Sequence, residues 1–539
     1  MASESTNRQF WQRGDPCVWA SGAALAAMLL GIAGMLVVVI GNGAVVFWPH
    51  RLCEFHLRDG SRVLGEEQQW QEERDGSARR VQVKVGNRDL YGLDFRWIDE
   101  SEVAGVSYPA EAVTLERREY GNFYGYLISV SAPDGGTGDG TAGDWAGLEA
   151  AWRQAQEQHK ALERLQDRID HCNLRMEKLR LRLLRLRYHG AADSDPRVVD
   201  ILGRQSALQT EFSAVVAESN AVAAACRKRT ASFVDSAGSG QTLAVLDIVR
   251  CYRPNAMGRV AKTGFYFGKV GELFLGEPRE ANTEGGLFPA IVGTVMMVFL
   301  MSVFSFPLGV MTAIYLREYA KDGVVVRLVR IAVNNLAGVP SIVYGIFGLG
   351  FFIYGVGGRL DQWFFPERLP TPTLGTGGIL WASLTLALLT VPVVIVASEE
   401  ALGAIPGGIR EGSLALGSTK LQTLTRLLLP MASPGIMTGF ILAMARAAGE
   451  VAPLMITGVV KLAPSLPVDG ASPFVHVERK FMHLGFHIYD IGFQSPNVEA
   501  SKPMVFTTTL LLVSLVLAMS GLAIYLRQRM KRRYAMGSF

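Results

Sequence analysis

The sequence predicts an all-α membrane protein with six transmembrane helices, into which a β-rich domain with an antiparallel helical hairpin is inserted. Of the 539 residues, 49% are hydrophobic and only 19% are charged, which is too apolar for one soluble domain of this length. Six apolar runs are each long enough to cross a bilayer. A long polar stretch with strand and heptad patterns separates the first run from the other five.

The first apolar run, Ala20 to Phe47, exceeds the roughly 18 to 20 residues that cross a bilayer, and Trp48 follows it at interface depth. A cleaved signal peptide is the competing interpretation. The length of the run and the lack of a clear small-x-small cleavage site favour an uncleaved anchor. We therefore expect residues 1–19 to be cytoplasmic and residues 20–48 to form the anchor helix.

Residues 49–286 are soluble in character and are predicted to lie outside the membrane. Alternation predicts β structure in 49–133 and 240–255, as in VQVKV, AVTLERREY, FYGYLISVS and LAVLDIVRCY. The Gly/Asp-rich stretch from Asp134 to Asp144 is predicted to be a flexible linker.

Residues 145–230 carry two heptad seams separated by the turn HGAADSDP, which predicts an antiparallel coiled-coil hairpin. The first seam contains Leu162, Leu165, Ile169, Cys172, Met176, Leu179, Leu183 and Leu186, and the second contains Val198, Ile201, Gln205, Leu208, Phe212, Val215, Ser219 and Val222. Arginines 180, 182, 185 and 187 face away from the seam. The simpler interpretation is that these arginines form a solvent-exposed face of the hairpin, and the alternative is a surface that collects anions.

The remaining composition excludes several classes of function. Net charge is +4 and the basic residues lie mostly in loops that flank spans and in the hairpin, so nothing indicates nucleic-acid binding. Five cysteines form no C-x-x-C, which argues against a metal site or a redox dithiol. No P-loop motif occurs, so we expect no cofactor here and any ATP to be used by a partner. Cys53 and Cys251 flank the two ends of the soluble region, and the sequence does not decide whether they form a disulfide.

Residues 287–526 contain the other five apolar runs, at 288–316, 331–356, 374–397, 433–460 and 505–526. Cationic residues gather in alternate loops and in the basic tail 527–539. The positive-inside rule assigns these loops to the cytoplasm. This topology places both chain termini and the loop 399–431 inside and residues 49–286 outside.

The loop from Arg410 to Pro430 is polar, basic and caught between two apolar runs. Its pattern comprises Glu411, Gly412, Ser413, Gly417, Leu427, Leu429 and Pro430. Small residues after Glu411 permit close helix approach, a glycine permits a turn, and a proline starts the next helix. Two short helices folded across a pivot are predicted, and an ordinary amphipathic loop is the alternative.

Arg446 and Glu450 lie four residues apart inside the predicted fifth span. A charge in hydrocarbon costs at least roughly 2.5 kcal/mol, so such residues are functional candidates. The guanidinium of Arg446 is always charged and its geometry suits the oxygens of an oxyanion at the translocation midline. Glu450 would hold the guanidinium in position. A structural ion pair between helices is the alternative. Asn334, Asn335 and Ser341 open the predicted third span, whose small residues either line a pathway or simply pack closely.

Three motifs, GVPSIVYGIFGLG, REGSLALGSTK and ARAAGEVAP, resemble those of the A-type membrane subunit of the phosphate-specific ABC importer. The resemblance covers about Gly285 to Leu526, and residues 49–286 are an enlargement beyond it. It implies the ABC-importer permease fold in a bacterial inner membrane, with residues 49–286 periplasmic and the loop 399–431 gripping an ATPase. It also implies that this chain is a non-catalytic translocation subunit, which forms a heterodimer with a homologous C-type permease. The other partners implied are two copies of a cytoplasmic ATPase and a periplasmic phosphate-binding protein.

Two other functional hypotheses compete with that of a phosphate permease. One is the same machine for another oxyanion, such as phosphonate or sulfate. The other is a membrane receptor with an extracellular coiled-coil sensor, although the longest predicted cytoplasmic stretch is the central loop itself. A membrane enzyme is disfavoured, because the eight histidines form no catalytic or metal cluster. His483 and His487 have no nearby acidic residue beyond Asp490.

Overall fold

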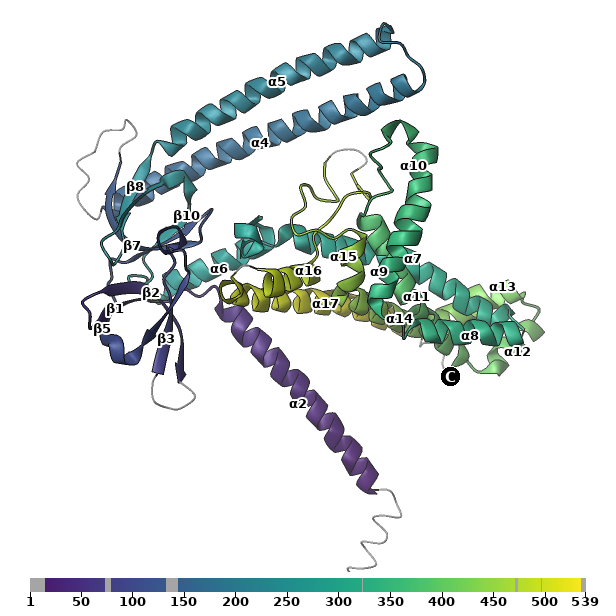
Figure 1. The fold of residues 1–539 in the computed structure, drawn as a ribbon. Coiled ribbons are helices and arrows are strands. Elements are labelled where there is room, and N and C mark those ends of the chain that lie inside the picture. The colour runs from purple at the N-terminus through teal and green to yellow at the C-terminus, as the bar shows by residue number, and fades with distance from the viewer. Residues whose placement is uncertain are drawn as a thin grey trace, which may run out of the picture. The chain divides into compact units, whose positions relative to one another are not determined.

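The computed structural model describes residues 15–72, 79–131, 144–321, 323–470, 474–495 and 497–534 (Figure 1). The predicted linker falls, except for Asp144, outside these residues, as do most of the predicted cytoplasmic N-terminus and the end of the basic tail. The chain divides into two compact units. We call residues 1–47, 289–353 and 377–539 the membrane unit, and residues 48–288 and 354–376 the β-rich unit.

The β-rich unit contains two antiparallel five-stranded sheets. The first has the order β4-β3-β2-β1-β5, with β1 Leu52–Leu57, β2 Arg62–Glu72, β3 Arg79–Lys84, β4 Phe95–Asp99 and β5 Val103–Ser107. The second has the order β10-β6-β7-β8-β9, with β6 Val113–Arg117, β7 Asn122–Val130, β8 Thr230–Val234, β9 Gly240–Ala244 and β10 Ile248–Tyr252. The predicted continuous strand over 243–252 is wrong, because a 3-10 turn, Val245–Asp247, separates β9 from β10.

Each sheet buries its own apolar face, and a small cluster joins them. Leu52 and Leu64 of the first sheet pack with Ala112 and Tyr124, and all four are buried. The two cysteines of the proposed disulfide are not bonded to each other: both are free, Cys53 in β1 and Cys251 in β10. Each lies in the core of a different sheet, so the unit is held together by apolar packing.

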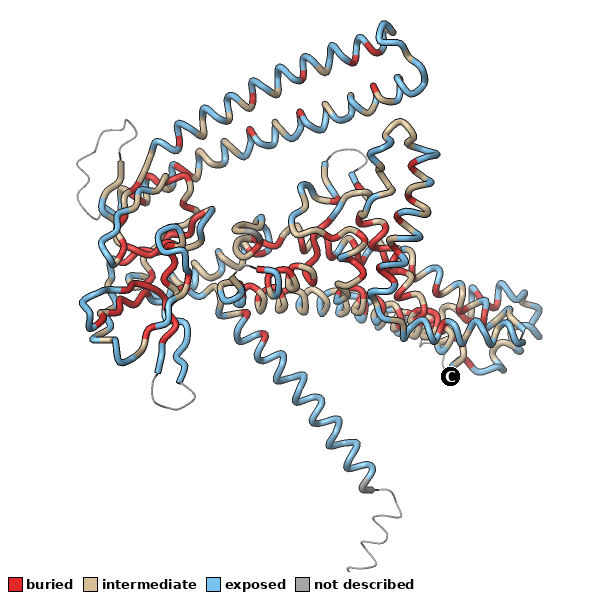
Figure 2. Tube along the Cα trace, in the orientation of Figure 1, coloured by how far each residue is buried: buried red, intermediate tan, exposed pale blue. Residues whose placement is uncertain are grey.

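The predicted hairpin is formed by two long helices, α4 Trp145–Tyr188 and α5 Pro196–Arg227, which pack against each other. Asp144 caps α4 by accepting a hydrogen bond from the backbone N–H of Gly147 (2.9 Å). Buried residues recur along both helices (Figure 2). Seven members of the predicted seams are buried, namely Leu165, Cys172, Leu183, Val198, Ile201, Leu208 and Val215. The base of α4 also covers the second sheet through Leu148, Ala151 and Ala155.

The segment 354–376 was predicted to belong to the membrane core, but it groups with the β-rich unit. Here α10 Gly358–Phe364 carries Asp361, whose buried carboxylate accepts hydrogen bonds from the backbone N–H groups of residues 373, 374 and 375. Glu367 accepts a hydrogen bond from Arg185 of the hairpin (2.9 Å). Burial alone would raise the pKa of Glu367, but the hydrogen bond from Arg185 lowers it. Two more of the four hairpin arginines are paired within the unit, Arg180 with Glu177 and Arg187 with Asp193.

Helix α6, Arg259–Leu275, follows β10 and was not predicted. Glu272 on this helix forms ion pairs with Lys269, Arg250 and Arg279, and Lys269 also pairs with Glu116 of β6. Burial alone would raise the pKa of Glu272, but the three cations lower it to about 2. This network fastens the C-terminal half of α6 to the second sheet.

Glu272→Gln should make the β-rich unit less sensitive to acid. Because the folded pKa is depressed, the carboxylate stabilises the unit above its unfolded pKa of about 4.5, and this stabilisation is lost as the pH falls toward about 2. The loss is of the order of 2 to 3 kcal/mol. We expect the wild-type unfolding temperature, measured calorimetrically on the full chain from pH 6 to pH 3, to fall more steeply than that of Glu272→Gln. Glu157→Gln, at an exposed carboxylate of α4, serves as control. Equal slopes for all three proteins would contradict the role of the network.

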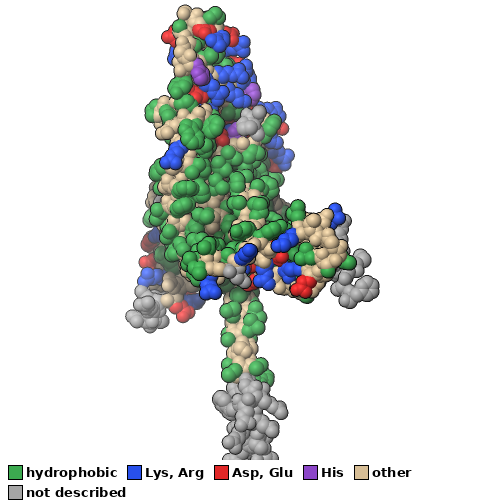
Figure 3. All heavy atoms as spheres, turned by 90° about the vertical axis from the view of Figure 1, so that its right-hand side faces the viewer, with side chains coloured by type: hydrophobic (Ala, Val, Ile, Leu, Met, Phe, Trp, Pro, Cys, Tyr) green, Lys and Arg blue, Asp and Glu red, His purple; other side chains and the backbone are tan. Residues whose placement is uncertain are grey.

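The membrane unit is helical throughout its described core. Its helices are α2 Asp15–Val45, α7 Phe288–Ile314, α8 Val324–Leu336, α9 Ser341–Phe347, α11 Ile379–Gly403, α12 Gly407–Ala415, α13 Lys420–Thr423, α14 Leu429–Gly449, α15 Ala452–Thr457, α16 Leu484–Tyr489 and α17 Val498–Tyr534. Among the described residues, six helical stretches are long and apolar enough to span a membrane: 17–45, 288–319, 341–364, 379–403, 420–449 and 498–531. Hydrophobic side chains stand exposed along α2 (Figure 3), as expected of a helix that faces lipid.

Two predicted spans were placed wrongly. The third begins at Ser341 and not at 331, because Pro340 ends the preceding turn and α8 is a separate helix. The fifth ends at Gly449 and not at 460, because the chain at Glu450 is extended. Both shifts occur where apolar residues run on through a break in the backbone, which hydropathy alone does not detect.

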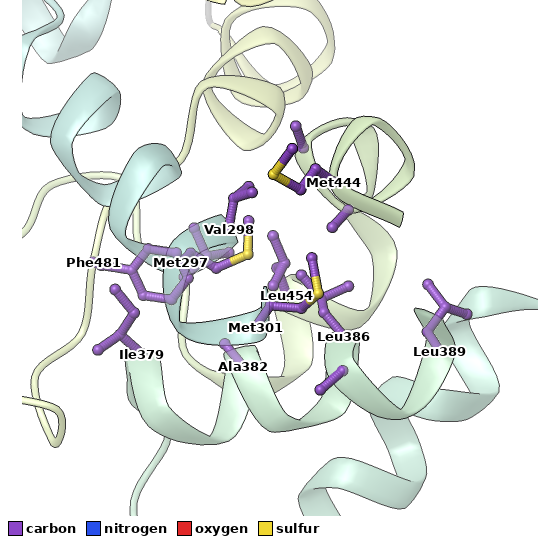
Figure 4. Packing of buried hydrophobic residues seen from close by; sticks show 14 of the residues in the cluster. Met297, Val298, Met301, Ile379, Ala382, Leu386, Leu389, Met444, Leu454 and Phe481 are labelled. Carbon is purple, nitrogen blue, oxygen red and sulfur yellow. The ribbon is translucent and has the colours of Figure 1, made fainter. Parts of the chain in front are cut away.

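Helix α11 is the centre of the membrane unit. Its side chains Ile379, Ala382 and Leu386 belong to one buried cluster with Met297 and Met301 of α7 (Figure 4). Met444, Leu454 and Phe481 are further members. Helix α14 approaches α11 closely at two glycines: a Cβ at Gly435 would lie 2.4 Å from the Cβ of Ala401, and one at Gly439 would lie 2.6 Å from that of Ala397. Small residues at these positions let the two backbones meet.

Candidate functional site

The loop between α11 and α14 contains a short helix and a glycine turn, as the sequence predicted. The predicted second short helix and a helix start at Pro430 are wrong, because residues 420–449 form one helical stretch. Helix α12, Gly407–Ala415, ends before Gly417, whose φ of 86° lies in the left-handed region that favours glycine. The next segment starts at Thr419, which forms a reciprocal capping box with Gln422. Ser413 on α12 hydrogen-bonds Thr423 on α13, with 2.9 Å between the hydroxyl oxygens. The loop is therefore internally braced.

Arg410 holds the base of this loop to the bundle. Its guanidinium donates to the backbone carbonyls of Leu402 (2.6 Å) and Ile405 (2.8 Å) at the end of α11. It also donates to the carboxylate of Glu318 (3.0 Å), just beyond α7. Arg410 was predicted as part of the loop pattern, but Glu318 lies 92 positions away in sequence. Sequence reasoning could not identify this partner.

The leucines that pack at the end of the loop lie outside the predicted spacing pattern. Leu427, Leu429 and Pro430 are only partly buried, whereas Leu424 and Leu428 are buried against Leu402 of α11. The segment Leu424–Leu428 is a π-helical turn, which rotates the side chains relative to an ordinary α-helix. A wider helical turn, which spacing does not reveal, therefore places Leu428 rather than Leu427 in the core.

The tip of the loop is exposed and partly apolar. Glu411, Gly412 and Gly417 are exposed. Leu416 is 89% exposed and Leu421 is 62% exposed. Apolar side chains held outward on a braced projection are typical of a surface that meets another protein.

Arg446 and Glu450 lie together at the opposite end of α14. Arg446 is in the last turn of this helix, and its Nε is 3.6 Å from the Glu450 Oε1. The prediction that both residues share one continuous helix is wrong, because Glu450 caps the helix in an extended conformation. The pair is nevertheless formed. Arg446 is 33% exposed and Glu450 21%, so both charges keep access to the surroundings.

The backbone break after Arg446 is supported by the segment that follows. Helix α15, Ala452–Thr457, packs against α9. A Cβ at Gly345 of α9 would lie 2.8 Å from the Cα of Pro453, so only a glycine permits this approach. Gly348 likewise abuts Thr385 and Thr457. Close packing therefore accounts for these two glycines of the predicted pathway segment, and it brings the N-terminal part of the third span beside the Arg446–Glu450 break.

The other predicted pathway residues lie apart from Arg446 in the described contacts. Asn334 and Asn335 are exposed on α8, and Ser341 is partly buried at the start of α9. Asn334 instead lines a hollow of about 460 Å³ at the end of α11 that carries the loop. Its charged lining comprises Arg317, Arg330, Glu399 and Glu400, and Arg330 donates to Glu399 at 2.8 Å. Sequence reasoning missed this paired cluster because its members come from three separate segments: the turn after α7, helix α8 and helix α11.

Histidine chemistry is not supported in the part of the chain that the structure describes. His483 and His487 are both buried, and burial lowers the pKa of His483 to about 3. His483 caps α16 by accepting a hydrogen bond from the N–H of Gly485. Within the described residues, no group of three or more His, Cys, Asp or Glu side chains is placed to hold a metal ion.

Comparison with known proteins places this fold in a family. The family model for binding-protein-dependent transport system inner membrane components matches residues 305–532, which include the loop and the Arg446–Glu450 pair. A probable phosphate transport system permease protein PstA of Methanocaldococcus jannaschii is 31% identical over 240 residues, covering 44% of this chain and 74% of that protein. PstA 1 of Mycobacterium tuberculosis is 39% identical over 173 residues, covering 32% of this chain and 51% of that protein. The chain thus spans about half the length of the mycobacterial relative.

Among solved structures, a chain of the MetNI methionine ABC transporter matches 45% of this chain and 95% of its own length, at 20% identity and a TM-score of 0.33. A score this low supports no further argument. The fold, the six apolar helices and the matched region define a multi-pass inner membrane component of a transport system. The chain belongs to the family of phosphate transport system permease proteins PstA.

Substitution of the two loop glycines should have opposite effects. Gly417→Ala forces an L side chain into the left-handed region and should destabilise the loop by about 1 kcal/mol. Gly412→Ala fills open space on an exposed helix and should stabilise it by up to about 1 kcal/mol. Hydrogen exchange of the amides of residues 411–423 in the full chain is expected to be faster in the first variant and slower in the second. Equal exchange in both would show that the turn is not the constraint inferred here.

Proposed function

We propose that this chain is the permease subunit of an ATP-driven importer that moves inorganic phosphate from a periplasmic binding protein to the cytoplasm. The observation that carries the proposal is the Arg446–Glu450 pair at a backbone break inside the helical bundle. Relatives that are named phosphate transport permeases support the choice of substrate.

Arg446 supplies the chemistry that a phosphate path requires. Guanidinium is charged at all working pH values, and its planar fork matches two oxygens of a tetrahedral oxyanion. Glu450, at 3.6 Å, is close enough to neutralise the guanidinium while the path is vacant. At that distance the two side chains form no hydrogen bond, so phosphate need not break one when it binds to Arg446. The carboxylate then competes with the anion and favours its release.

The loop Arg410–Pro430 transmits the motion. ATP is hydrolysed by a separate subunit, and this chain is the non-catalytic, translocating member. The exposed leucines 414, 416 and 421 suit a groove on that ATPase. Arg410, bonded to the ends of α11 and to Glu318, passes displacement of the loop to two membrane helices at once.

The assembly proposed has four kinds of component. They are this chain, a homologous C-type permease with which it forms a heterodimer, two copies of a cytoplasmic ATPase, and a periplasmic phosphate-binding protein. Both termini lie in the cytoplasm and the β-rich unit is periplasmic, in agreement with the distribution of Lys and Arg between loops. The hairpin of that unit, packed as an antiparallel coiled coil, helps to dock the binding protein or the partner permease.

Arg446→Gln should abolish high-affinity phosphate uptake. The variant keeps a polar side chain but loses the charge and the guanidinium, so we expect uptake of labelled phosphate at micromolar concentration to fall at least tenfold. Cells lacking the gene are complemented with wild type, Arg446→Gln, Arg446→Lys or the exposed control Arg327→Gln, at equal membrane levels. Excess sulfate or phosphonate is the competitor. Normal uptake with Arg446→Gln would refute the anion site, and strong competition would reassign the substrate to another oxyanion.

Removal of the distal hairpin tests its role in delivery. Residues 162–222 are replaced by a short Gly-rich turn, which leaves the base of α4 that packs on the second sheet. We expect uptake to fall at least tenfold while insertion is unchanged. Glu367→Gln, which breaks only the contact between Arg185 and residues 354–376, separates loss of docking from loss of that contact. Full uptake without the hairpin would exclude a role in delivery.

A further inference from the structure

A hollow of about 510 Å³ lies in the β-rich unit where the chain enters it and where α6 begins. It is lined by Trp48, Pro49, His50, Arg51, Tyr108, Pro254, Asn255, Met257, Arg259 and Lys262. Two stretches more than 200 positions apart in sequence form most of its wall. We refer to it as the basic hollow.

The charge of the basic hollow is of one sign. Arg51, Arg259, Lys262 and the titratable His50 line it, and no carboxylate does. Among the described residues, no ion pair joins any of the four to an acid. Two less exposed cations elsewhere in the same unit are paired, Lys269 with Glu116 and Arg117 with Asp89. The cations of the basic hollow therefore remain available to an anion.

The arrangement is also unfavourable without an anion. Arg259 and Lys262 lie in the first turn of α6, which has no acidic residue and no side-chain cap. The N-terminal end of a helix is its positive end and is stabilised by negative charge. Partial burial, and then the proximity of Arg51, lower the pKa of Lys262. A bound anion would offset both sources of repulsion.

The wall of the basic hollow is fixed in place by Asn255. Its side-chain amide donates to the carbonyls of Leu52 (2.9 Å) and Pro109 (2.8 Å), and its carbonyl accepts from the N–H of Leu52 (3.0 Å). Lys262 donates to the carbonyl of Pro49 (3.2 Å). These bonds tie the start of β1 to the loop before α6, so the cations are held together by the fold and not by chance exposure.

The chain connectivity places the basic hollow close to the membrane surface. His50 is five residues beyond Val45, the end of the first apolar helix, so an extended chain separates them by at most about 18 Å. Trp48 is of the residue type that favours the bilayer interface. Helix α6 exposes Val260, Phe267 and Leu275 at 88%, 66% and 78%, and an amphipathic helix of this kind suits the headgroup region.

We propose that the basic hollow binds a phosphate-bearing anion through Arg51, Arg259 and Lys262. The charge is of the right sign, the volume exceeds that of one phosphate group, and the position is within reach of lipid phosphates. The shared chemistry is a phosphate oxyanion, whether it belongs to an anionic lipid headgroup or is free. The site is separate from Arg446 and does not depend on the transport function.

The test uses the full-length chain in nanodiscs, with hydrogen exchange of residues 255–266 as the readout. One arm compares phosphatidylcholine discs with discs that contain phosphatidylglycerol of the same acyl chains. The other adds inorganic phosphate to phosphatidylcholine discs, against chloride at equal ionic strength. Arg51→Gln/Lys262→Gln is compared with Arg164→Gln/Arg182→Gln, which removes the same charge from exposed positions of α4.

We expect protection of these amides by phosphatidylglycerol or by phosphate in the wild type and in the α4 variant. The phosphate concentration or phosphatidylglycerol content that gives half of the protection should rise about tenfold in Arg51→Gln/Lys262→Gln. This is the effect expected from the loss of a charge-assisted hydrogen bond. Protection in the lipid arm alone identifies a headgroup, and protection by phosphate alone identifies a free anion. No protection in either arm, or equal shifts in both double variants, would overturn the proposal.

Discussion

The membrane unit depends on the close contact between α11 and α14. Lipid provides no hydrophobic force that would drive two helices together, so their association rests on packing, and Gly435 and Gly439 bring the backbones near enough for it. The loop joins one end of this helix pair and the Arg446–Glu450 break lies at the other. Sixteen residues of helix separate Pro430 from Arg446, about 24 Å at 1.5 Å per residue. A rigid pair of helices is the direct physical link between the loop and the Arg446–Glu450 break.

The two ends of that link solve different problems. At the loop, Arg410 donates to the carbonyls of Leu402, in the last turn of α11, and Ile405, just beyond it, while leucines 414, 416 and 421 are exposed. At the break, the backbone leaves the helix at Glu450, which is tolerated only where protein or water covers it. The contact of Gly345 with Pro453 supplies part of that cover. Stable backbone geometry and accessible charge therefore coexist at Arg446.

The β-rich unit uses charge in two contrasting ways. The network around Glu272 pairs cations and carboxylates in a partly buried setting, and it fastens one end of α6 to the second sheet. At the other end of the same helix, the cations of the basic hollow have no carboxylate among the described residues. Structural pairing is thus complete where it fixes the helix, and positive charge is left over where the helix begins. The contrast within a single helix argues for a ligand at the uncompensated end.

The sequence by itself determined the number of apolar helices, the helical hairpin, the glycine turn of the loop and the Arg446–Glu450 pair, because each depends on residues close together in the chain. It misplaced the third and fifth spans, since hydropathy continues through a backbone break, and it joined β9 to β10 across a tight turn. Only the tertiary structure decided that Leu428 and not Leu427 anchors the loop, that Glu318 pairs with Arg410, and that residues 354–376 pack on the hairpin. It also showed Cys53 and Cys251 in separate cores. Those features are contacts between distant segments, and local periodicity carries no information on which distant surfaces will meet.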